Sequence, residues 1–238
     1  MADLDYLLAP IREELLDRVC QGEDSVGSCF YSGFGYPQGK PACVDAFTAA
    51  SLHDDPSFLR IPEGLEDASL DCLVVDLVFH WAGFRQQLAT VLRVLRPGGR
   101  LIFSTFGPDT LRQARSAWAG IDEFPHVHEF EDMHHLGDAL VAAGFHQPIV
   151  DAQWINVEFP GARALMADLR GSGMTNVNPD RRRTLTGKTR IAEFIAAYNR
   201  MGSNGLVNET FEIIYGMAVR PEALPGQGPV SVKVNPPA

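Results

Sequence analysis

A glycine-rich stretch near the amino terminus holds the first residues whose types and spacing could do chemistry. Gly33 and Gly35 follow a short segment, residues 25–32, that predicts a strand, and Asp45 closes the next apolar run. Glycines after a strand let the backbone approach a bound phosphate or sugar, and an acid after the next strand can accept hydrogen bonds from hydroxyl groups. The pattern is that of a nucleotide-type cofactor loop.

The same stretch departs from a working loop in three ways. Phe34 stands between the two glycines, and residues 25–31 contain no acid. Only eight residues, 34–41, separate Gly33 from Ala42, and two of them are prolines. A connecting helix would need about ten residues at ~1.5 Å rise per residue to return along a strand. The sequence therefore predicts a shortened, degenerate loop without that helix.

A basic segment lies further along the chain. Residues 160–200 hold eight Arg or Lys and three Asp or Glu, so the segment carries 8 − 3 = +5 within a chain of net charge -10. Such a cluster is either a solvated face or a docking patch for an acidic protein, because electrostatic attraction steers association. The residues of the candidate patch are Arg181, Arg182, Arg183, Lys188 and Arg190.

Two further kinds of site are set aside. Four histidines, at 126, 128, 134 and 135, lie among acids, but no cysteine is near and we expect no metal. The G-x-S-x-G elbow of a Ser hydrolase is absent from the sequence.

Composition limits the classes of function. The chain has 238 residues, 45% of them hydrophobic, and a net charge of -10 argues against general nucleic-acid binding. No apolar run approaches the ~20 residues of a membrane span, and the amino terminus lacks the pattern of a signal peptide. Four widely spaced cysteines predict reduced thiols and a cytoplasmic protein.

The elements that would position these residues follow from periodicity. Residues 70–77 and 100–106 are apolar runs typical of buried strands, and they flank a helical pattern over 84–95 and a Pro97-Gly98-Gly99 turn. This βαβ unit requires a parallel sheet. Other predicted helices cover 4–19, 108–118, 132–143, 161–171 and 187–200, and other strands 42–45, 148–159 and 208–220.

We expect an α/β fold with a mostly parallel sheet and an antiparallel last strand. One domain spans 1–220, with a helical insertion over about 160–205, and 221–238 form an extended or disordered tail.

The stretch from Leu70 to Phe106 resembles the strand 4, helix D, strand 5 block of class I S-adenosylmethionine-dependent methyltransferases. The following residues, 107–145, resemble the BioC family, the malonyl-acyl-carrier-protein O-methyltransferases of biotin synthesis. Three later segments do so too, at 167–177, 185–187 and 210–220. The resemblance implies a trimmed Rossmann-like sandwich and methyl transfer from S-adenosylmethionine to a malonyl thioester on an acyl carrier protein.

The resemblance also implies roles for residues of the cofactor site. Gly33 and Gly35 would form its turn, Asp45 would bind the ribose, and Asp76, after strand 4, would line the pocket. It assigns no catalytic residue here. Because acyl carrier proteins are acidic, the basic segment suits one as a partner.

Three functions remain open at this point. They are a BioC-like enzyme, a non-catalytic module that docks an acidic partner, and a role like that of a related mitochondrial complex I assembly factor.

Overall fold

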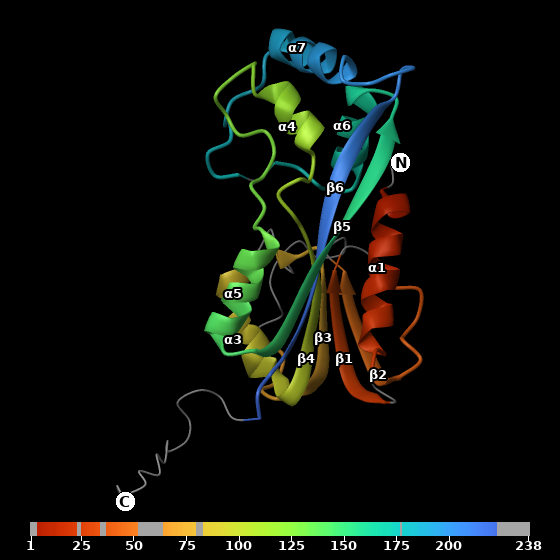
Figure 1. The fold of residues 1–238 in the computed structure, drawn as a ribbon, viewed down its shortest axis with the longest axis vertical. Coiled ribbons are helices and arrows are strands. Elements are labelled where there is room, and N and C mark those ends of the chain that lie inside the picture. The colour runs from red at the N-terminus through yellow and green to blue at the C-terminus, as the bar shows by residue number, and fades with distance from the viewer. Residues whose placement is uncertain are drawn as a thin grey trace, which may run out of the picture.

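A six-stranded sheet forms the centre of the protein in the computed structural model, which describes residues 4–22, 25–33, 37–51, 64–79, 83–176 and 178–222 (Figure 1). The strand order is β2-β1-β3-β4-β6-β5, with β1 to β4 parallel and β6 antiparallel to both its neighbours. This confirms the predicted α/β class with a mostly parallel sheet. The strands are β1 (Val26–Gly33), β2 (Val44–Ser51), β3 (Leu70–Asp76), β4 (Leu95–Phe106), β5 (His146–Phe159) and β6 (Val207–Val219).

Helices cover both faces of this sheet and one of its ends. Helix α1 (Asp5–Val19) packs on one face, while α3 (Phe84–Val94) and α5 (Met133–Ala143) lie on the other side (Figure 1). The antiparallel pair β5–β6 extends beyond the parallel strands and reaches α4 (Arg112–Trp118), α6 (Ala162–Gly171) and α7 (Lys188–Asn199). We call residues 107–131 and 160–206, which contain these three helices, the cap.

Apolar periodicity explains the core. In α1 the residues spaced three or four apart, Leu8, Ile11, Leu15 and Val19, are buried against the sheet. Strand β3 is buried on both faces, as a central parallel strand must be. No helix in the described ranges is long and apolar enough to cross a membrane.

Two predicted boundaries are wrong around β2 and β4. Strand β2 starts at Val44 and continues to Ser51, so Asp45 lies at its beginning and not at its end. The described part of the β1–β2 connection, residues 37–43, contains no helix, as its short length predicts. The Pro97-Gly98-Gly99 turn lies within β4, where Gly98 adopts φ 76° and the pairing with β3 shifts register.

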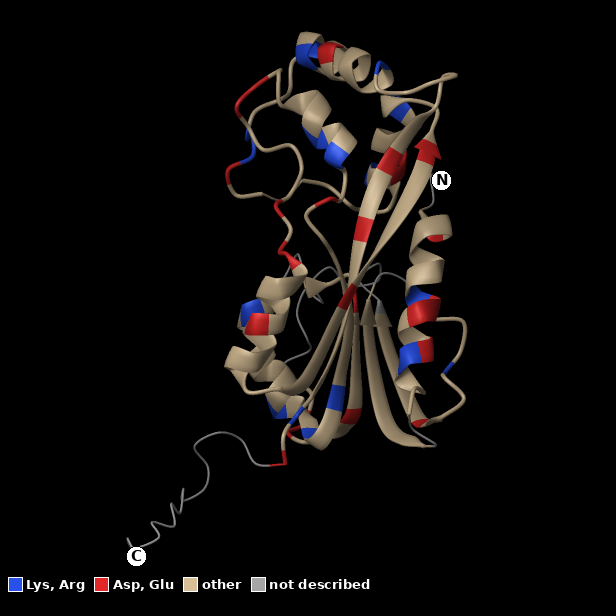
Figure 2. Ribbon diagram, viewed as in Figure 1, with Lys and Arg blue, Asp and Glu red and all other residues tan. Residues whose placement is uncertain are grey.

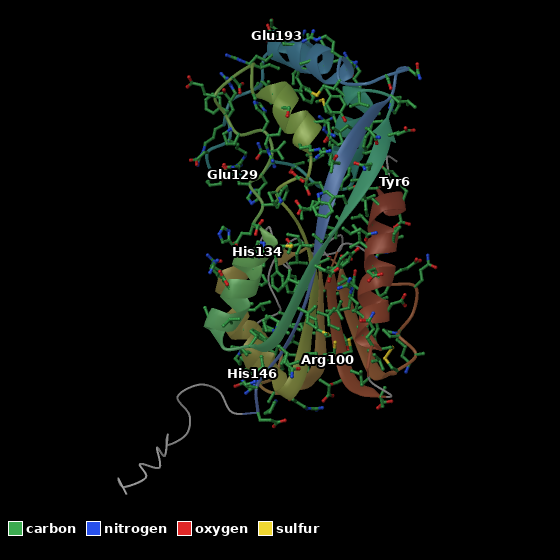
Figure 3. The ribbon with its side chains drawn as sticks, viewed as in Figure 1. Tyr6, Arg100, Glu129, His134, His146 and Glu193 are labelled. Carbon is green, nitrogen blue, oxygen red and sulfur yellow. A yellow bond between two sulfur atoms is a disulfide. The ribbon has the colours of Figure 1, made fainter. Side chains whose placement is uncertain are left out.

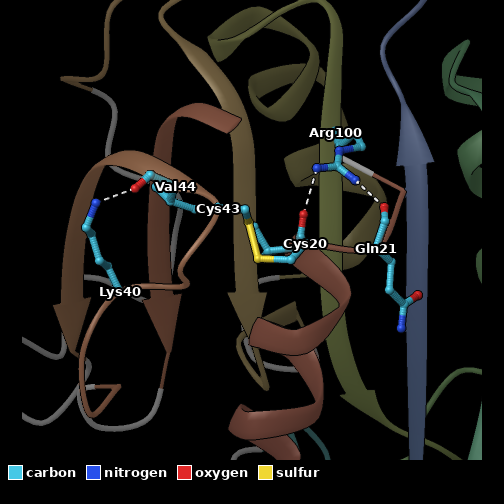
Figure 4. The surroundings of a disulfide bond; sticks show 7 residues. Cys20, Gln21, Lys40, Cys43, Val44 and Arg100 are labelled. Atoms are coloured by element: carbon cyan, nitrogen blue, oxygen red, sulfur yellow. Dashed lines mark hydrogen bonds between the residues drawn. A yellow bond between two sulfur atoms is a disulfide. The ribbon is translucent and has the colours of Figure 1, made fainter. Parts of the chain in front are cut away.

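A disulfide joins Cys20, at the end of α1, to Cys43, just before β2 (Figure 4). The prediction of four reduced, unpaired cysteines is therefore wrong for this pair. Their 23-residue separation forms no motif, and only the packing of α1 brings the two Cα atoms to 5.6 Å. Arg100 also holds this end of α1, because its guanidinium donates to the carbonyls of Val19 at 2.8 Å and Gln21 at 3.3 Å. Cys29 and Cys72 are free thiols buried on neighbouring strands.

Candidate functional site

Gly33 and Asp76 meet at the carboxyl ends of β1 and β3, where they are register partners. A Cβ atom on Gly33 would lie 2.6 Å from the Asp76 Cβ and 2.6 Å from the Tyr31 hydroxyl. Glycine is therefore needed here because the protein's own side chains approach the backbone closely. The corner that the glycine leaves open is filled by Tyr31 and Asp76.

The Asp76 carboxylate is enclosed by polar side chains from three elements. Tyr31 donates to Oδ2 at 2.7 Å, Ser104 of β4 donates to Oδ1 at 2.8 Å, and the Arg12 Nε of α1 lies 3.9 Å from Oδ2. Only 1% of Asp76 is exposed. Burial raises the pKa of this carboxyl group, although the hydrogen bonds and the Arg12 charge oppose that shift. Both carboxylate oxygens are thus engaged within the protein.

Asp45 lies at the opposite end of the strands from Gly33. Its neighbours Val44 and Ala46 pair with Val26 and Ser28 at the start of β1, whereas Gly33 pairs with Ser51. Along β2, Asp45 lies six residues before Ser51, which corresponds to roughly 20 Å of extended strand. The exposed Asp45 accepts a 3.4 Å hydrogen bond from Ser25. Asp45 and Gly33 cannot contact one ligand, so the prediction that Asp45 closes the second strand beside the glycine turn is wrong. Gly35 lies outside the described residues.

These placements test whether S-adenosylmethionine fits. The glycine corner is filled, the Asp76 carboxylate is enclosed, and the acid expected to bind the ribose lies at the far end of the strands. Gly33 and Asp76 therefore meet as predicted, whereas Asp45 does not join them, so these three predicted cofactor residues do not form one site.

The cap contains a cavity of about 430 Å³ between its three helices and the end of β4. Aromatic and aliphatic side chains form most of its wall, and polar groups are few, as is typical of sites for small molecules. The apolar lining includes Phe106, Trp118, Phe130, Leu165, Phe194 and Phe211, and the polar lining includes Thr110, His128, Arg170, Asn176, Arg181 and Arg182. Such a site suits a ligand with an apolar body and an anionic end.

Asp122 connects the separate segments of the cap. Its side chain is 7% exposed and lies 2.7 Å from the His126 Nε2, 3.7 Å from the Arg190 Nε and 3.9 Å from an Arg182 Nη1. Burial of Asp122 acts to raise its pKa. The hydrogen bonds from His126 and from the Phe124 amide, together with the charge of Arg190, outweigh burial and lower the pKa. The carboxylate thus holds Arg182 and Arg190 of the second cap segment against the first, residues 107–131.

An aromatic stack reinforces the same connection. The His126 ring lies 3.6 Å from the Trp118 ring at an interplanar angle of 6°, and Trp118 stacks on Phe194 of α7 at 4.4 Å. The predicted docking residues divide accordingly: Arg182 and Arg190 face Asp122, Arg181 donates to the Asn178 carbonyl at 3.0 Å, and Arg183 and Lys188 are exposed.

The four histidines do not form one cluster. His126 and His128 lie in the loop that lines the cavity, whereas His134 is in the first turn of α5 (Figure 3). Across the part of the chain that the structure describes, no three His, Cys, Asp or Glu side chains gather as metal ligands would.

Sequence reasoning missed the cavity because its wall comes from residues far apart in the chain, within 106–130, within 165–194 and at Phe211. The sequence did offer one signal for a second apolar cluster, namely the aromatic residues in and before the helical insertion. Apolar side chains in a polar insertion must be buried against one another or against the sheet.

Comparisons with known proteins agree with this architecture. A methyltransferase-domain family model matches residues 54–103. A malonyl-[acyl-carrier protein] O-methyltransferase of Laribacter hongkongensis is 40% identical over 190 residues, which cover 79% of this chain and 63% of that protein. Malonyl-[acyl-carrier protein] O-methyltransferase 1 of Coxiella burnetii is 40% identical over 159 residues, which cover 66% of this chain and 56% of that protein.

A solved structure supports the fold alone. A Bacillus halodurans protein assigned to the methyltransferases superposes with a TM-score of 0.53 at 13% identity, covering 88% of this chain and 98% of that one. The chain spans 63% and 56% of the length of the two relatives above.

Proposed function

We propose that this chain, a homologue of the malonyl-[acyl-carrier protein] O-methyltransferases with a class I methyltransferase fold, acts on a malonyl thioester carried by an acyl carrier protein. The observation that supports this proposal most is the cap cavity, which combines aromatic walls with arginines. Carboxylate recognition by arginine and burial of an apolar arm are what such a ligand requires.

Each part of the ligand has a counterpart among the described residues. The malonyl carboxylate would pair with Arg181 or Arg182 in the cavity lining, and the pantetheine arm would pack on the aromatic wall. The exposed Arg183 and Lys188 would meet the acidic carrier. Fixing the carboxylate in an apolar cavity also removes it from water, which raises its reactivity toward a methyl donor.

The methyl donor is the part of the relatives' reaction for which the described candidate residues, Gly33, Asp45 and Asp76, do not all come together. This observation favours a second candidate, a protein that binds the malonyl carrier without transferring a methyl group. In that case the Arg12–Tyr31–Asp76 network closes the old cofactor corner, and the cap retains its ligand.

Calorimetry and a transfer assay on the purified chain distinguish these candidates. We expect binding of malonyl-loaded carrier protein in preference to the unloaded carrier. Arg182→Ala should weaken binding by at least about tenfold, because charge-assisted hydrogen bonds are worth ~1.5–3 kcal/mol. Arg163→Ala, which changes an exposed arginine of α6 outside the cavity lining, is the matched control.

Titration with S-adenosylmethionine and an assay for transfer of a labelled methyl group decide between the two candidate functions. Methyl transfer to the malonyl carrier makes the chain an enzyme, and carrier binding without transfer makes it a binding module. Equal affinity for loaded and unloaded carrier would disprove the proposed function.

A further inference from the structure

A leucine on the surface of the cap is almost completely exposed. Leu185 shows 96% of its surface to solvent, whereas Val141, the next most exposed large hydrophobic residue in the described ranges, shows 59%. A single exposed apolar residue is ordinary on a protein surface, and only its surroundings can give it a function. Three features of those surroundings point to a contact with another protein.

The first feature is the position of Leu185 beside the cap cavity. Arg181 and Thr186 both line the cavity, yet Arg181 is exposed and Thr186 is only half-buried, so the cavity reaches the surface at this loop. Leu185 directly precedes Thr186 and lies three residues after Arg182, another lining residue. A ligand that enters here on an arm attached to a protein therefore brings the surface of that protein against Leu185.

The second feature is the anchoring of the loop that carries Leu185. The Asn178 carbonyl accepts a hydrogen bond from the Arg181 amide at 3.1 Å and another from the Arg181 Nη1 at 3.0 Å. The Arg182 Nε donates to the Thr184 hydroxyl, directly before Leu185, at 3.0 Å. The exposed leucine thus belongs to a loop with internal hydrogen bonds, which lowers the entropy cost of binding a partner.

The third feature is the mixture of apolar surface and positive charge around Leu185. Arg183 and Lys188, two residues before it and three after it, are both exposed. Phe124 of the first cap segment is 42% exposed, and the Arg182 guanidinium packs over its ring at 5.1 Å. We call Phe124, Arg183, Leu185 and Lys188 the rim surface. Apolar side chains between cations suit an acidic partner that presents an apolar side chain of its own.

We propose that the acyl carrier protein docks on the rim surface and that Leu185 is the main apolar contact between the two proteins. This inference rests on the proposed function and names the surface that its partner uses. Arg183 and Lys188 attract the acidic carrier from a distance, and Leu185 is buried only once the carrier has docked. The leucine therefore stabilises the bound complex, and the charges mainly speed its formation.

Two probes separate docking of the carrier from occupation of the cavity on the full chain. Malonyl-loaded carrier protein would contact the rim surface and the cavity, whereas malonyl-pantetheine, the loaded arm alone, would contact only the cavity. By calorimetry, Leu185→Ala should weaken binding of the loaded carrier about tenfold, as loss of a buried leucine side chain implies, and should leave the affinity for malonyl-pantetheine unchanged. Leu185→Met, which keeps the apolar volume, should retain most of the carrier affinity.

Controls distinguish this contact from a structural role and from charge. Because Leu185 is exposed, the melting temperature of the ligand-free Leu185→Ala protein should equal that of the unmodified protein. Leu206→Ala, which changes an exposed leucine directly before β6 and outside the rim surface, should bind the carrier normally. The effect of Leu185→Ala should persist in high salt, because salt screens charges and does not weaken apolar burial.

The outcomes separate the two proposals. If the unmodified protein binds neither probe, the proposed function fails and the docking assignment fails with it. If the unmodified protein binds both probes and folded Leu185→Ala keeps the full carrier affinity, only the assignment to Leu185 is overturned. Equal weakening of both probes in Leu185→Ala would place the leucine's effect in the cavity and would overturn the docking assignment as well.

Discussion

Asp76 shows how one residue can keep its place in a fold while its surroundings change its chemistry. It ends β3 beside Gly33, where a ligand-binding acid would stand, but Tyr31, Ser104 and Arg12 take up its oxygens. Its carboxyl group is fully buried, and burial raises its pKa. Protonation in the folded state is therefore favoured relative to the unfolded chain.

This shift predicts a pH-dependent stability. Because the folded-state pKa lies above the unfolded value, the native protein binds more protons between these values, and the free energy of unfolding falls as pH rises through that interval. Asp76→Asn removes this component, so urea denaturation across acidic pH should show a smaller decline than in the unmodified protein. Asp45→Asn, at an exposed position, should leave the decline as it is. Equal declines in all three proteins would contradict the burial argument.

The sequence identified some site residues and could not identify others. Gly33 and Asp76 end two recognisable strands, so their meeting at the carboxyl ends of those strands was predictable. Asp45 was misplaced, because an acid after an apolar run reads the same whether it begins a strand or ends one. Asp122 depends on contacts between segments some 60 residues apart, such as its contact with Arg182, and no local pattern encodes those contacts.

Among the elements, the β1–β2 connection is unusual because a parallel pair is joined without a described helix. The Cys20–Cys43 disulfide attaches the end of α1 to this connection, and Arg100 of β4 holds the same end of the helix. Closing a loop of 23 residues restricts the unfolded chain and contributes about 3 kcal/mol in the chain-entropy model.

We therefore expect Cys20→Ser/Cys43→Ser to lower the free energy of unfolding by about 3 kcal/mol in guanidinium denaturation. Adding a reductant should destabilise the unmodified protein by a similar amount and should leave the double variant unchanged. A reductant effect on the double variant would mean that the buried Cys29 and Cys72 take part.

The pairing of β6 with β4 depends on a glycine. A Cβ atom on Gly216 would lie 2.2 Å from the Phe103 ring, in the middle of the sheet. Gly216→Ala should cost about 1–3 kcal/mol of unfolding free energy, as overpacking of a core does. The control is Gly120→Ala, because nothing lies within 4 Å of a Cβ there. Phe103→Leu combined with Gly216→Ala should recover part of the loss, and no recovery would place the strain elsewhere.

Element prediction succeeded where the apolar period is strong. The β3–α3–β4 unit was predicted because buried parallel strands give continuous apolar runs. Strand β2 was predicted only as residues 42–45, because the rest of its sequence VDAFTAAS mixes small and polar residues on an edge strand, where burial demands little. Pro37 and Pro41 correctly excluded a helix from the described residues 37–43.

For the whole molecule, charge is unevenly distributed. The chain carries -10 overall, but the cap places Arg and Lys on α7 and on the loop before it (Figure 2). Like-charge repulsion between an acidic carrier and the sheet end would orient the carrier toward the cap. That the whole of residues 1–220 is one domain stays a prediction.

Association with a carrier protein should therefore depend on salt. Arg183→Glu/Lys188→Glu should reduce the association rate in stopped-flow measurements at low ionic strength, and the difference should shrink in high salt because screening removes the steering. Arg96→Glu, at the opposite end of the molecule, should have little effect. A rate that does not change with salt would exclude electrostatic docking through this surface.

Strand β6 lies between β4 and β5 in the sheet although it is the last strand of the described chain. During synthesis, β4 and β5 therefore emerge from the ribosome with no neighbour for their facing edges until Val207–Val219 has followed them. Unpaired edges and exposed apolar strands are the features that chaperones bind and that lead to aggregation. The sheet can close only in one late step, so the nascent protein depends on protection until nearly all of its described residues have been translated.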